Sequence, residues 1–401
     1  MGKDRKLNLL YCFAQGLYWM SYGVAVSFSA VFLQGIGYNN TELGLILSFG
    51  HILGFILSNF LGGLIDKRKT MTATSTAMVV LTINLFVVLF NTTITEPSII
   101  IYFTYPIYVA LSVTINSLII KIWADFEHQG RHLVFSYARA FGSLTFVLLT
   151  TFLGKIVMSF GISILPRIAV AIITLQLLTI ILLKREYTTE SQSSVGKENQ
   201  SALPSNNGGS VFSFLIHNKS FFILLIGLSV MFISHYITGS FLINVVTNIG
   251  GDTASLGYIN GFMALLEVPV IIIYTSLHKK MPTKTIMKIS ILFFVLKAIG
   301  LSLAPSMPVL FLAYLLHIPS YALFIPTIVD YVREEIPYED SAKGQSLASS
   351  VTTLGSVFAG FIGGRLYDVV GVNKTTLIAV FISLAGILIS FIGLDYKRRN
   401  E

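Results

Sequence analysis

Long apolar runs separated by short polar turns fill the chain from Leu7 to Leu394. An α-helix rises 1.5 Å per residue, so about 20 apolar residues are enough to cross the hydrocarbon core of a bilayer. The pattern therefore predicts an all-α polytopic membrane protein with 12 transmembrane helices. We expect these spans over residues 7–33, 42–65, 71–90, 99–124, 133–157, 164–183, 219–246, 255–277, 285–304, 309–331, 346–367 and 375–394.

One long hydrophilic stretch, Lys184–Asn218, divides the predicted spans into two sets of six. It is rich in Ser, Asn, Gln and Gly and poor in large apolar residues, a composition typical of a flexible tether. We predict an N-terminal six-helix bundle over 1–186, a cytoplasmic linker over 187–216 and a C-terminal six-helix bundle over 217–401. Paired six-span halves are typical of transporters, whose solute site lies near the midplane between the halves.

The charge of the chain fits this membrane assignment. Hydrophobic residues make up 54% of the sequence and charged residues 11%, and the formal net charge is +8. With both termini in the cytoplasm, most Lys and Arg residues fall on the cytoplasmic side, as the positive-inside rule requires. We therefore expect a multi-pass protein of the cytoplasmic (plasma) membrane. Its expected partner is the lipid bilayer and not a nucleic acid.

Several chemistries have no sequence support. Cys12 is the single cysteine, so neither an internal disulfide nor a thiol-rich metal site can form. The first span is too long for a cleaved signal, so we expect an uncleaved anchor. The chain has no P-loop, no His-Glu-x-x-His and no Gly-x-Ser-x-Gly motif. We therefore expect no cofactor, no metal and no enzymatic activity, a monomeric protein, and an ion gradient as the energy source for uphill transport.

Three ionisable residues lie deep in the spans of the C-terminal half: Glu267, Lys297 and His317. A charge at membrane depth costs several kcal/mol, so such residues usually face a cavity or a partner. An acid, a base and an imidazole in one layer predict proton coupling. The alternative is a static Glu267–Lys297 ion pair, with His317 hydrogen-bonded in the packing.

Arg139 is the corresponding charge in the N-terminal half, about 12 Å into the fifth span. Its guanidinium offers a planar fork of donors to hydroxyls or carboxylates. Small residues, Gly142 and Ser143, follow one turn later, which favours a cavity over snorkelling to the surface. Lys121 and Asp125, one turn apart in the fourth span, form either part of that cavity or a surface pair.

The isolated imidazoles and the aromatic rings within the spans can each be interpreted as solute contacts or as packing residues. His235 in the seventh span is a candidate solute contact, although a hydrogen-bonded packing role is commoner. Trp19 and Tyr22 belong to an aromatic group in the first span that could stack on a solute. The commoner role of such a group is helix packing and an interfacial belt.

The loop after the second span carries a glycine-and-charge motif. Glycines allow two helix ends to approach closely, and an Asp at a helix terminus beside cations can form a breakable ionic latch. The candidate latch residues are Gly62, Asp66, Lys67 and Lys69. The motif resembles the cytoplasmic-loop motif of the major facilitator superfamily, and it reads Gly62-Gly63-Leu64-Ile65-Asp66-Lys67-Arg68-Lys69.

Within that superfamily the chain is similar to the lactose permease type of oligosaccharide:proton symporter. Arg139-Ala140-Phe141-Gly142 resembles the span-5 patch with the sugar-binding Arg, and Phe146 falls where that family has a stacking Trp. Lys297-Ala298-Ile299-Gly300 resembles a span-9 patch involved in proton coupling, and Leu316-His317 matches the span-10 His. The resemblance implies solute binding by Arg139 and Phe146.

The same comparison also shows departures from the family pattern. The family Glu three residues after the span-10 His is Ser320 here, and the span-4 sugar-binding Glu aligns with Lys121. Two cations facing one cavity would suit an anionic or oxygen-rich solute. The loss of the span-10 acid leaves Glu267 as the best remaining proton carrier.

These residues lead to one favoured function and two alternatives. The favoured one is secondary active transport of a small polar solute, sugar-like or an organic anion, by proton-coupled symport with alternating access. The first alternative is a proton-driven exporter of amphipathic drugs or lipids. The second is a non-transporting membrane protein, either a sensor or an intramembrane enzyme.

Overall fold

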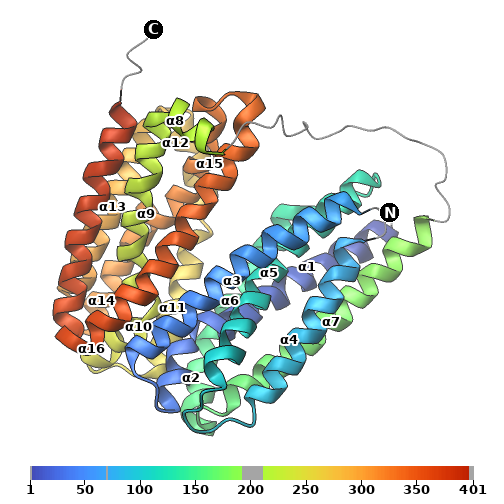
Figure 1. Ribbon diagram of the computed structural model, residues 1–401, viewed down its shortest axis with the longest axis horizontal. Helices are drawn as coiled ribbons and strands as arrows, with labels where there is room; N and C mark the ends of the chain where they lie inside the picture. The colour runs from blue at the N-terminus through green and yellow to red at the C-terminus, as the bar shows by residue number, and fades with distance from the viewer. Residues whose placement is uncertain (1, 69–70, 192–210, 397–401) are drawn as a thin grey trace. The chain divides into compact units, whose positions relative to one another are not determined.

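The computed structural model describes residues 2–68, 71–191 and 211–396, and within these ranges its regular elements are all helical (Figure 1). The predicted all-α class is confirmed. Among the described residues, nine helices are long and apolar enough to cross a membrane, or ten if a bent pair in the first span is included. The total of 12 spans and the side on which the termini lie stay predictions.

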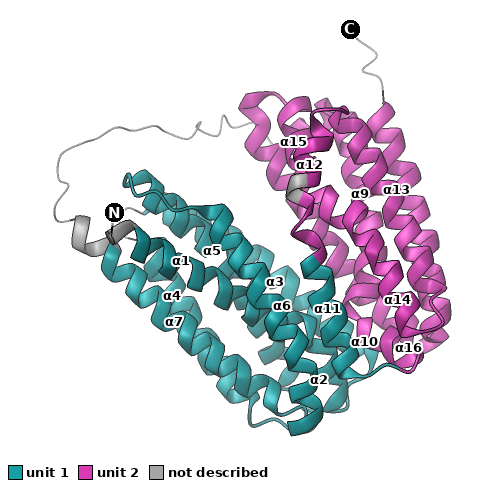
Figure 2. Cartoon of the chain, turned by 180° about the vertical axis from the view of Figure 1, so that it is seen from behind, with its two compact units in different colours: residues 1–198, 251–265 teal, residues 199–250, 266–401 magenta. Residues whose placement is uncertain are grey.

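The chain forms two compact units (Figure 2). Unit 1 comprises Met1–Glu198 and Gly251–Leu265, and unit 2 comprises Asn199–Gly250 and Leu266–Glu401. The start of the predicted eighth span therefore belongs to unit 1. Residues 192–210, the main part of the predicted linker, lie outside the described residues.

Unit 1 is built mainly from long helices that pack on one another through apolar faces. Its elements are α1 (Gly2–Tyr22), the π-helical turn η1 (Gly23–Ser27), α2 (Ser29–Gly35), α3 (Asn40–Lys67), α4 (Ala73–Asn91), α5 (Ile101–His128), α6 (Phe135–Phe160), α7 (Ile164–Ser191) and most of α11 (Thr253–Glu267). The first predicted span is thus interrupted, since its two helical parts bend by 42°.

Unit 2 contains more interruptions. Its elements are α8 (Val211–His217), α9 (Lys219–Ser240), α10 (Leu242–Asn248), α12 (Val270–His278), α13 (Thr283–Ser302), α14 (Met307–Tyr314), the short turns η2 (Leu315–His317) and η3 (Ile318–Ala322), α15 (Leu323–Glu335), η4 (Tyr338–Asp340) and α16 (Ser341–Asp395). Gly371, with φ 77°, breaks α16 between the predicted eleventh and twelfth spans.

The predicted continuous helix over 255–277 is interrupted after Glu267. Asp252 precedes the first part and accepts hydrogen bonds from the backbone N–H and the hydroxyl of Ser255, at 2.8 and 2.7 Å. These bonds cap α11 and lower the pKa of the Asp252 carboxyl. Pro269 precedes α12 and has no N–H to continue the hydrogen-bond ladder. Glu267 therefore stands at a helix C-terminus and not in the middle of a helix.

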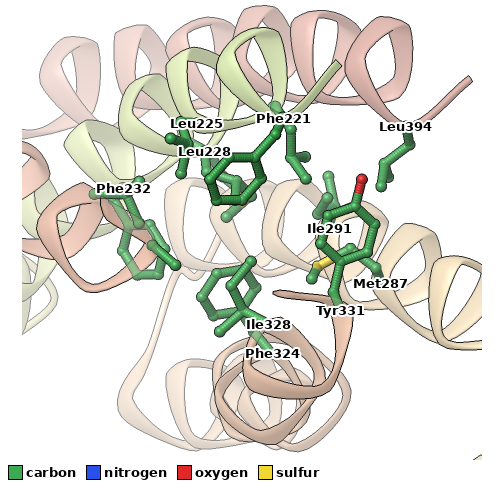
Figure 3. Packing of buried hydrophobic residues seen from close by; sticks show 14 of the residues in the cluster. Phe221, Leu225, Leu228, Phe232, Met287, Ile291, Phe324, Ile328, Tyr331 and Leu394 are labelled. Atoms are coloured by element: carbon green, nitrogen blue, oxygen red, sulfur yellow. The ribbon is translucent and has the colours of Figure 1, made fainter. Parts of the chain in front are cut away.

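A large apolar cluster fixes the helices of unit 2 that carry the buried charges. Phe232 on α9, Ile291 on α13 and Phe324 on α15 belong to it (Figure 3). The Phe232 ring meets Phe294 and Phe324 edge-on, with centroids 5.5 and 5.2 Å apart. Such close packing holds α9, α13 and α15 in register, so side chains one or two turns further along are brought together.

Close backbone contact joins α6 to the first part of α11 inside unit 1. A Cβ atom added at Gly154 would lie 2.7 Å from the Ala254 Cα and closer still to the Thr253 carbonyl oxygen. A Cβ at Gly257 would likewise meet the Thr150 carbonyl oxygen. These glycines allow two helix backbones to touch, as small residues do in membrane proteins.

We expect Gly154→Ala to destabilise the protein by about 1–3 kcal/mol, because the new methyl group meets backbone atoms that cannot yield cheaply. The matched control is Gly239→Ala on α9, where a Cβ meets nothing within 4 Å. The control should be neutral or stabilising, since alanine favours helix. Thermal unfolding in detergent measures both variants. Equal midpoints for the two would contradict the close contact.

Candidate functional site

Four polar side chains of unit 2 and one tyrosine ring form a connected cluster. The Glu267 carboxylate lies 3.4 Å from Nε2 of His317. The Lys297 ammonium lies 3.3 Å from Nδ1 of His235. The Tyr321 ring stacks on both imidazoles, with each centroid 5.2 Å away. These contacts join a carboxylate, two imidazoles and an ammonium in one chain, which we name the charge cluster.

The helix interruptions and the apolar core position this cluster. Glu267 is the last residue of α11, and His317 is the last residue of the 3₁₀ turn η2. Lys297 and His235 come from the intact helices α13 and α9. His235 and Lys297 thus lie on helices that the apolar core holds in place. His317 lies on a turn that continues through η3 into the core helix α15. The sequence predicted three of these residues together and placed His235 elsewhere, as a solute contact.

The side chains of the charge cluster are buried to different degrees, and this difference affects proton transfer between them. Lys297 is 2% exposed and His317 is 4% exposed. The Glu267 side chain keeps 31% of its surface accessible. A carboxyl group in contact with a buried imidazole, yet open on one side, can exchange a proton with solvent and pass it inward. The carboxyl and the imidazole thus have the contact that proton transfer between two side chains requires.

A second group of candidate residues lies in unit 1, around Trp19. The Arg139 guanidinium carbon lies 4.3 Å from the centre of the indole, a cation–π contact. The guanidinium also donates to the Ser143 hydroxyl at 2.9 Å. Tyr22 and Phe146 meet the indole edge-on, with centroids 5.7 and 6.3 Å away. Arg139, Trp19, Tyr22 and Phe146, all predicted solute contacts, are therefore neighbours; we name them the aromatic–arginine group.

Local sequence explains why these rings and the arginine meet. Trp19 and Tyr22 are three residues apart on α1, so they share a face. Arg139 and Phe146 are seven residues apart on α6 and share one too. Gly142, between them, leaves the space that the indole fills, because a Cβ there would clash with Trp19. The group combines half-buried aromatic faces with a planar donor fork, a combination suited to an oxygen-rich ring or a carboxylate.

In this structure Lys121 forms an ion pair with one of the predicted latch residues, Asp66. Its ammonium is 2.6 Å from the Asp66 carboxylate, a pair that joins α5 to the end of α3. A Cβ added at Gly62 would meet nothing within 4 Å outside its own helix backbone, and Lys67 is the last residue of α3. Lys69 lies outside the described residues. The predicted latch Asp thus has a partner on a neighbouring helix, and that partner is the residue predicted to bind solute.

We expect the Lys121–Asp66 pair to contribute only about 0–1 kcal/mol to folding stability. The Lys121 and Asp66 side chains are 28% and 66% exposed, so water screens the attraction between them. A double-mutant cycle of Lys121→Gln and Asp66→Asn, followed by denaturant unfolding in detergent, measures the coupling. High salt should reduce it further. A coupling energy above about 2 kcal/mol would show instead a desolvated pair.

Sequence reasoning did not single out Tyr321, although a signal existed. Tyr321 follows His317 by four residues, and this spacing places two side chains on one face of a helical segment. His235 was recognised as an isolated imidazole, but its contact with Lys297 depends on how α9 packs on α13. No pattern within a single span reveals that contact.

The fold and these two groups of residues describe a helical membrane transporter of the major facilitator type. A family model described as the MFS_1 like family matches residues 6–378. Because this match covers most of the chain, the chain belongs to that family. It is accordingly a multi-pass membrane transporter and not an enzyme.

Individual proteins are similar to the chain to different extents. A Deinococcus radiodurans protein described as a candidate sugar efflux transporter is 29% identical over 146 residues, 36% of this chain and 37% of that relative. The match thus spans well under half of the relative's length.

Solved structures agree with the fold over nearly the full chain. The nucleoside transporter NupG has a TM-score of 0.80 at 16% identity, with 99% of this chain and 100% of that chain covered. A bacterial homologue of the human lysosomal transporter Spinster has a TM-score of 0.72 at 11% identity, with 98% and 97% covered. At such low identity these likenesses establish the fold alone.

Proposed function

We propose that the protein is a secondary active transporter that moves a small polar solute, sugar-like or an organic anion, across the cytoplasmic membrane by proton-coupled symport. The observation that carries this proposal is the contact between Glu267 and the buried imidazole of His317, 3.4 Å apart. A partly exposed carboxyl and a buried base form the minimal pair that binds a proton and passes it on. Lys297 completes the predicted coupling set through its contact with His235.

The aromatic–arginine group is the proposed solute site. Aromatic faces stack on the apolar face of a ring, and the Arg139 fork donates to hydroxyls or a carboxylate. The resemblance to the lactose permease type and the relative described as a candidate sugar efflux transporter both support a sugar-like solute. Lys121 and His235 are further proposed solute contacts. The two proposed halves of the transporter are the six-helix bundles over 1–186 and 217–401. The bundles move in alternating access, and the monomer is the working unit.

Export by proton antiport is the second candidate function. The specific observation in its favour is the word efflux in the description of the Deinococcus radiodurans relative. The solutes expected for such an exporter are amphipathic drugs or lipids. The same partly exposed carboxyl and buried imidazole serve either direction, because the protein only needs to bind the proton and the solute in a linked order.

A flux experiment in proteoliposomes separates these functions. A thermal-shift screen of sugars, sugar acids, nucleosides and aromatic acids first selects a solute, since binding stabilises the folded form by mass action. An inward gradient of that solute is then imposed on vesicles that contain a pH-sensitive dye. Symport acidifies the lumen and antiport makes it alkaline, whereas a protonophore removes both signals. Solute entry without any pH change would overturn proton coupling.

A further inference from the structure

The Tyr321 ring stacks on both imidazoles of the charge cluster. Its centroid is 5.2 Å from the His317 centroid, with 19° between the planes, and 5.2 Å from the His235 centroid, with 26° between the planes. Both pairs of ring planes are close to parallel, so the contacts are offset stacks, and the rings come from α9, η2 and η3. A single ring therefore contacts both histidines, although these are bound to different partners, Glu267 and Lys297.

The backbone around Tyr321 departs from an α-helix, and this departure directs the ring. The tenth predicted span changes from α14 to the 3₁₀ turn η2 and then to the π-helical turn η3. Pro319 lacks the N–H of a regular ladder. The Ser290 hydroxyl of α13 donates to the Ser320 carbonyl at 2.8 Å, which ties η3 to α13. Short π-helical segments frequently occur at functional sites.

Stacking restricts how an imidazole can turn. An isolated histidine ring rotates about χ2 in a broad, roughly two-fold well, and a ring that turns out of its plane directs its nitrogens away from their partners. A flat ring against one face removes part of this freedom. In the charge cluster the correct nitrogens are Nε2 of His317, toward Glu267, and Nδ1 of His235, toward Lys297.

We propose that Tyr321 is a positioning residue, which holds His235 and His317 in the orientations that connect Lys297 to Glu267. The proposal rests on the proposed proton coupling for its functional consequence, but the stack itself can be tested separately. The titratable groups that face the two imidazoles are Glu267 from α11, Lys297 from α13, Tyr236 from α9 and Tyr321 from η3. A phenylalanine ring keeps both stacking contacts, so it should hold the two imidazoles in the same planes as tyrosine does.

Three variants test this role. Tyr321→Phe keeps the ring and removes the hydroxyl, whereas Tyr321→Leu removes the ring. The matched control is Tyr314→Leu on α14, which removes a second tyrosine ring of the same predicted span, one that is buried. Among the described residues that ring stacks on neither imidazole.

The first measurement is NMR of the histidine side chains in detergent-solubilised protein with isotope-labelled histidine. The chain has seven histidines, and the signals of His235 and His317 are assigned by replacing each with glutamine. We expect Tyr321→Leu to move both signals, because the ring current of the stacked ring is lost. Tyr321→Phe and Tyr314→Leu should leave both in place. Unmoved signals in Tyr321→Leu would overturn the proposal.

The second measurement is the pH profile of solute-driven proton flux in proteoliposomes. We expect Tyr321→Leu to shift its midpoint by about one pH unit, a tenfold change in a proton-binding equilibrium. Tyr321→Phe should keep the wild-type midpoint. Wild-type profiles in both variants, despite moved NMR signals, would show that the stack has no positioning role. Absent proton flux in the wild type would refute the proposed function alone, because the NMR result would still report the stack.

Discussion

Glu267→Gln is expected to lower solute-driven proton flux at least about tenfold, equivalent to about 1.4 kcal/mol. Glutamine has nearly the shape of glutamate and can keep a hydrogen bond to His317, but it cannot take up and release a proton. The 3.4 Å contact with His317 and the partial exposure of the carboxyl are the reasons why we propose Glu267 as the point where protons enter the charge cluster. Without that entry point, the cluster has no carboxyl to connect its imidazoles to water.

The variant should separate coupling from solute binding. Counterflow, in which labelled solute exchanges for unlabelled solute with no net proton movement, should stay near the wild-type rate. The matched control is Glu339→Gln in η4, which changes an exposed carboxyl in the same way. Proteoliposomes with a pH-sensitive dye measure flux, and radiolabelled solute measures counterflow. If Glu267→Gln and wild type gave equal proton flux, the assignment of Glu267 to coupling would be wrong.

Arg139→Lys is expected to weaken solute binding about 10- to 100-fold, or about 1.4–2.7 kcal/mol. Lysine keeps the positive charge but loses the planar fork that can donate two parallel hydrogen bonds. It also loses the flat face that lies 4.3 Å above the Trp19 ring. Because the charge is unchanged, a loss of this size would show that geometry, rather than charge, recognises the solute.

Thermal-shift titration with the solute chosen in the screen measures this loss directly. Arg167→Lys on α7 is the matched control, since Arg167 is exposed. It should bind as the wild type does. The pH midpoint of proton flux at saturating solute should be the same in Arg139→Lys and wild type, because Arg139 belongs to unit 1 and the charge cluster to unit 2. Unchanged affinity in Arg139→Lys would remove it from the solute site.

The sequence predicted the helical class and the ionisable residues of the candidate site. Both predictions follow from the apolar solvent that the bilayer provides. Twenty apolar residues predict a span wherever they occur, and an ionisable group inside one needs a reason to be there. Glu267, Lys297 and His317 were found in this way, and the structure places all three within one cluster. Trp19, Tyr22, Arg139 and Phe146 also prove to be neighbours.

The sequence could not reveal where the helices break or which partner a long side chain selects. Pro269 ends the ladder close to Glu267, yet Pro106 lies inside the unbroken helix α5. A proline therefore marks a place where a break is possible, and tertiary packing decides the outcome. Lys121 carries a flexible four-carbon stem, and only the structure shows that its ammonium reaches Asp66.

Cys12 on α1 is a free thiol and the only cysteine in the chain. One substitution by serine consequently yields a thiol-free background, in which a pair of introduced cysteines can carry spin labels or fluorophores at chosen places. Labels placed on either side of Pro269, or at the ends of α14 and α15, would report whether the interrupted helices bend while solute passes.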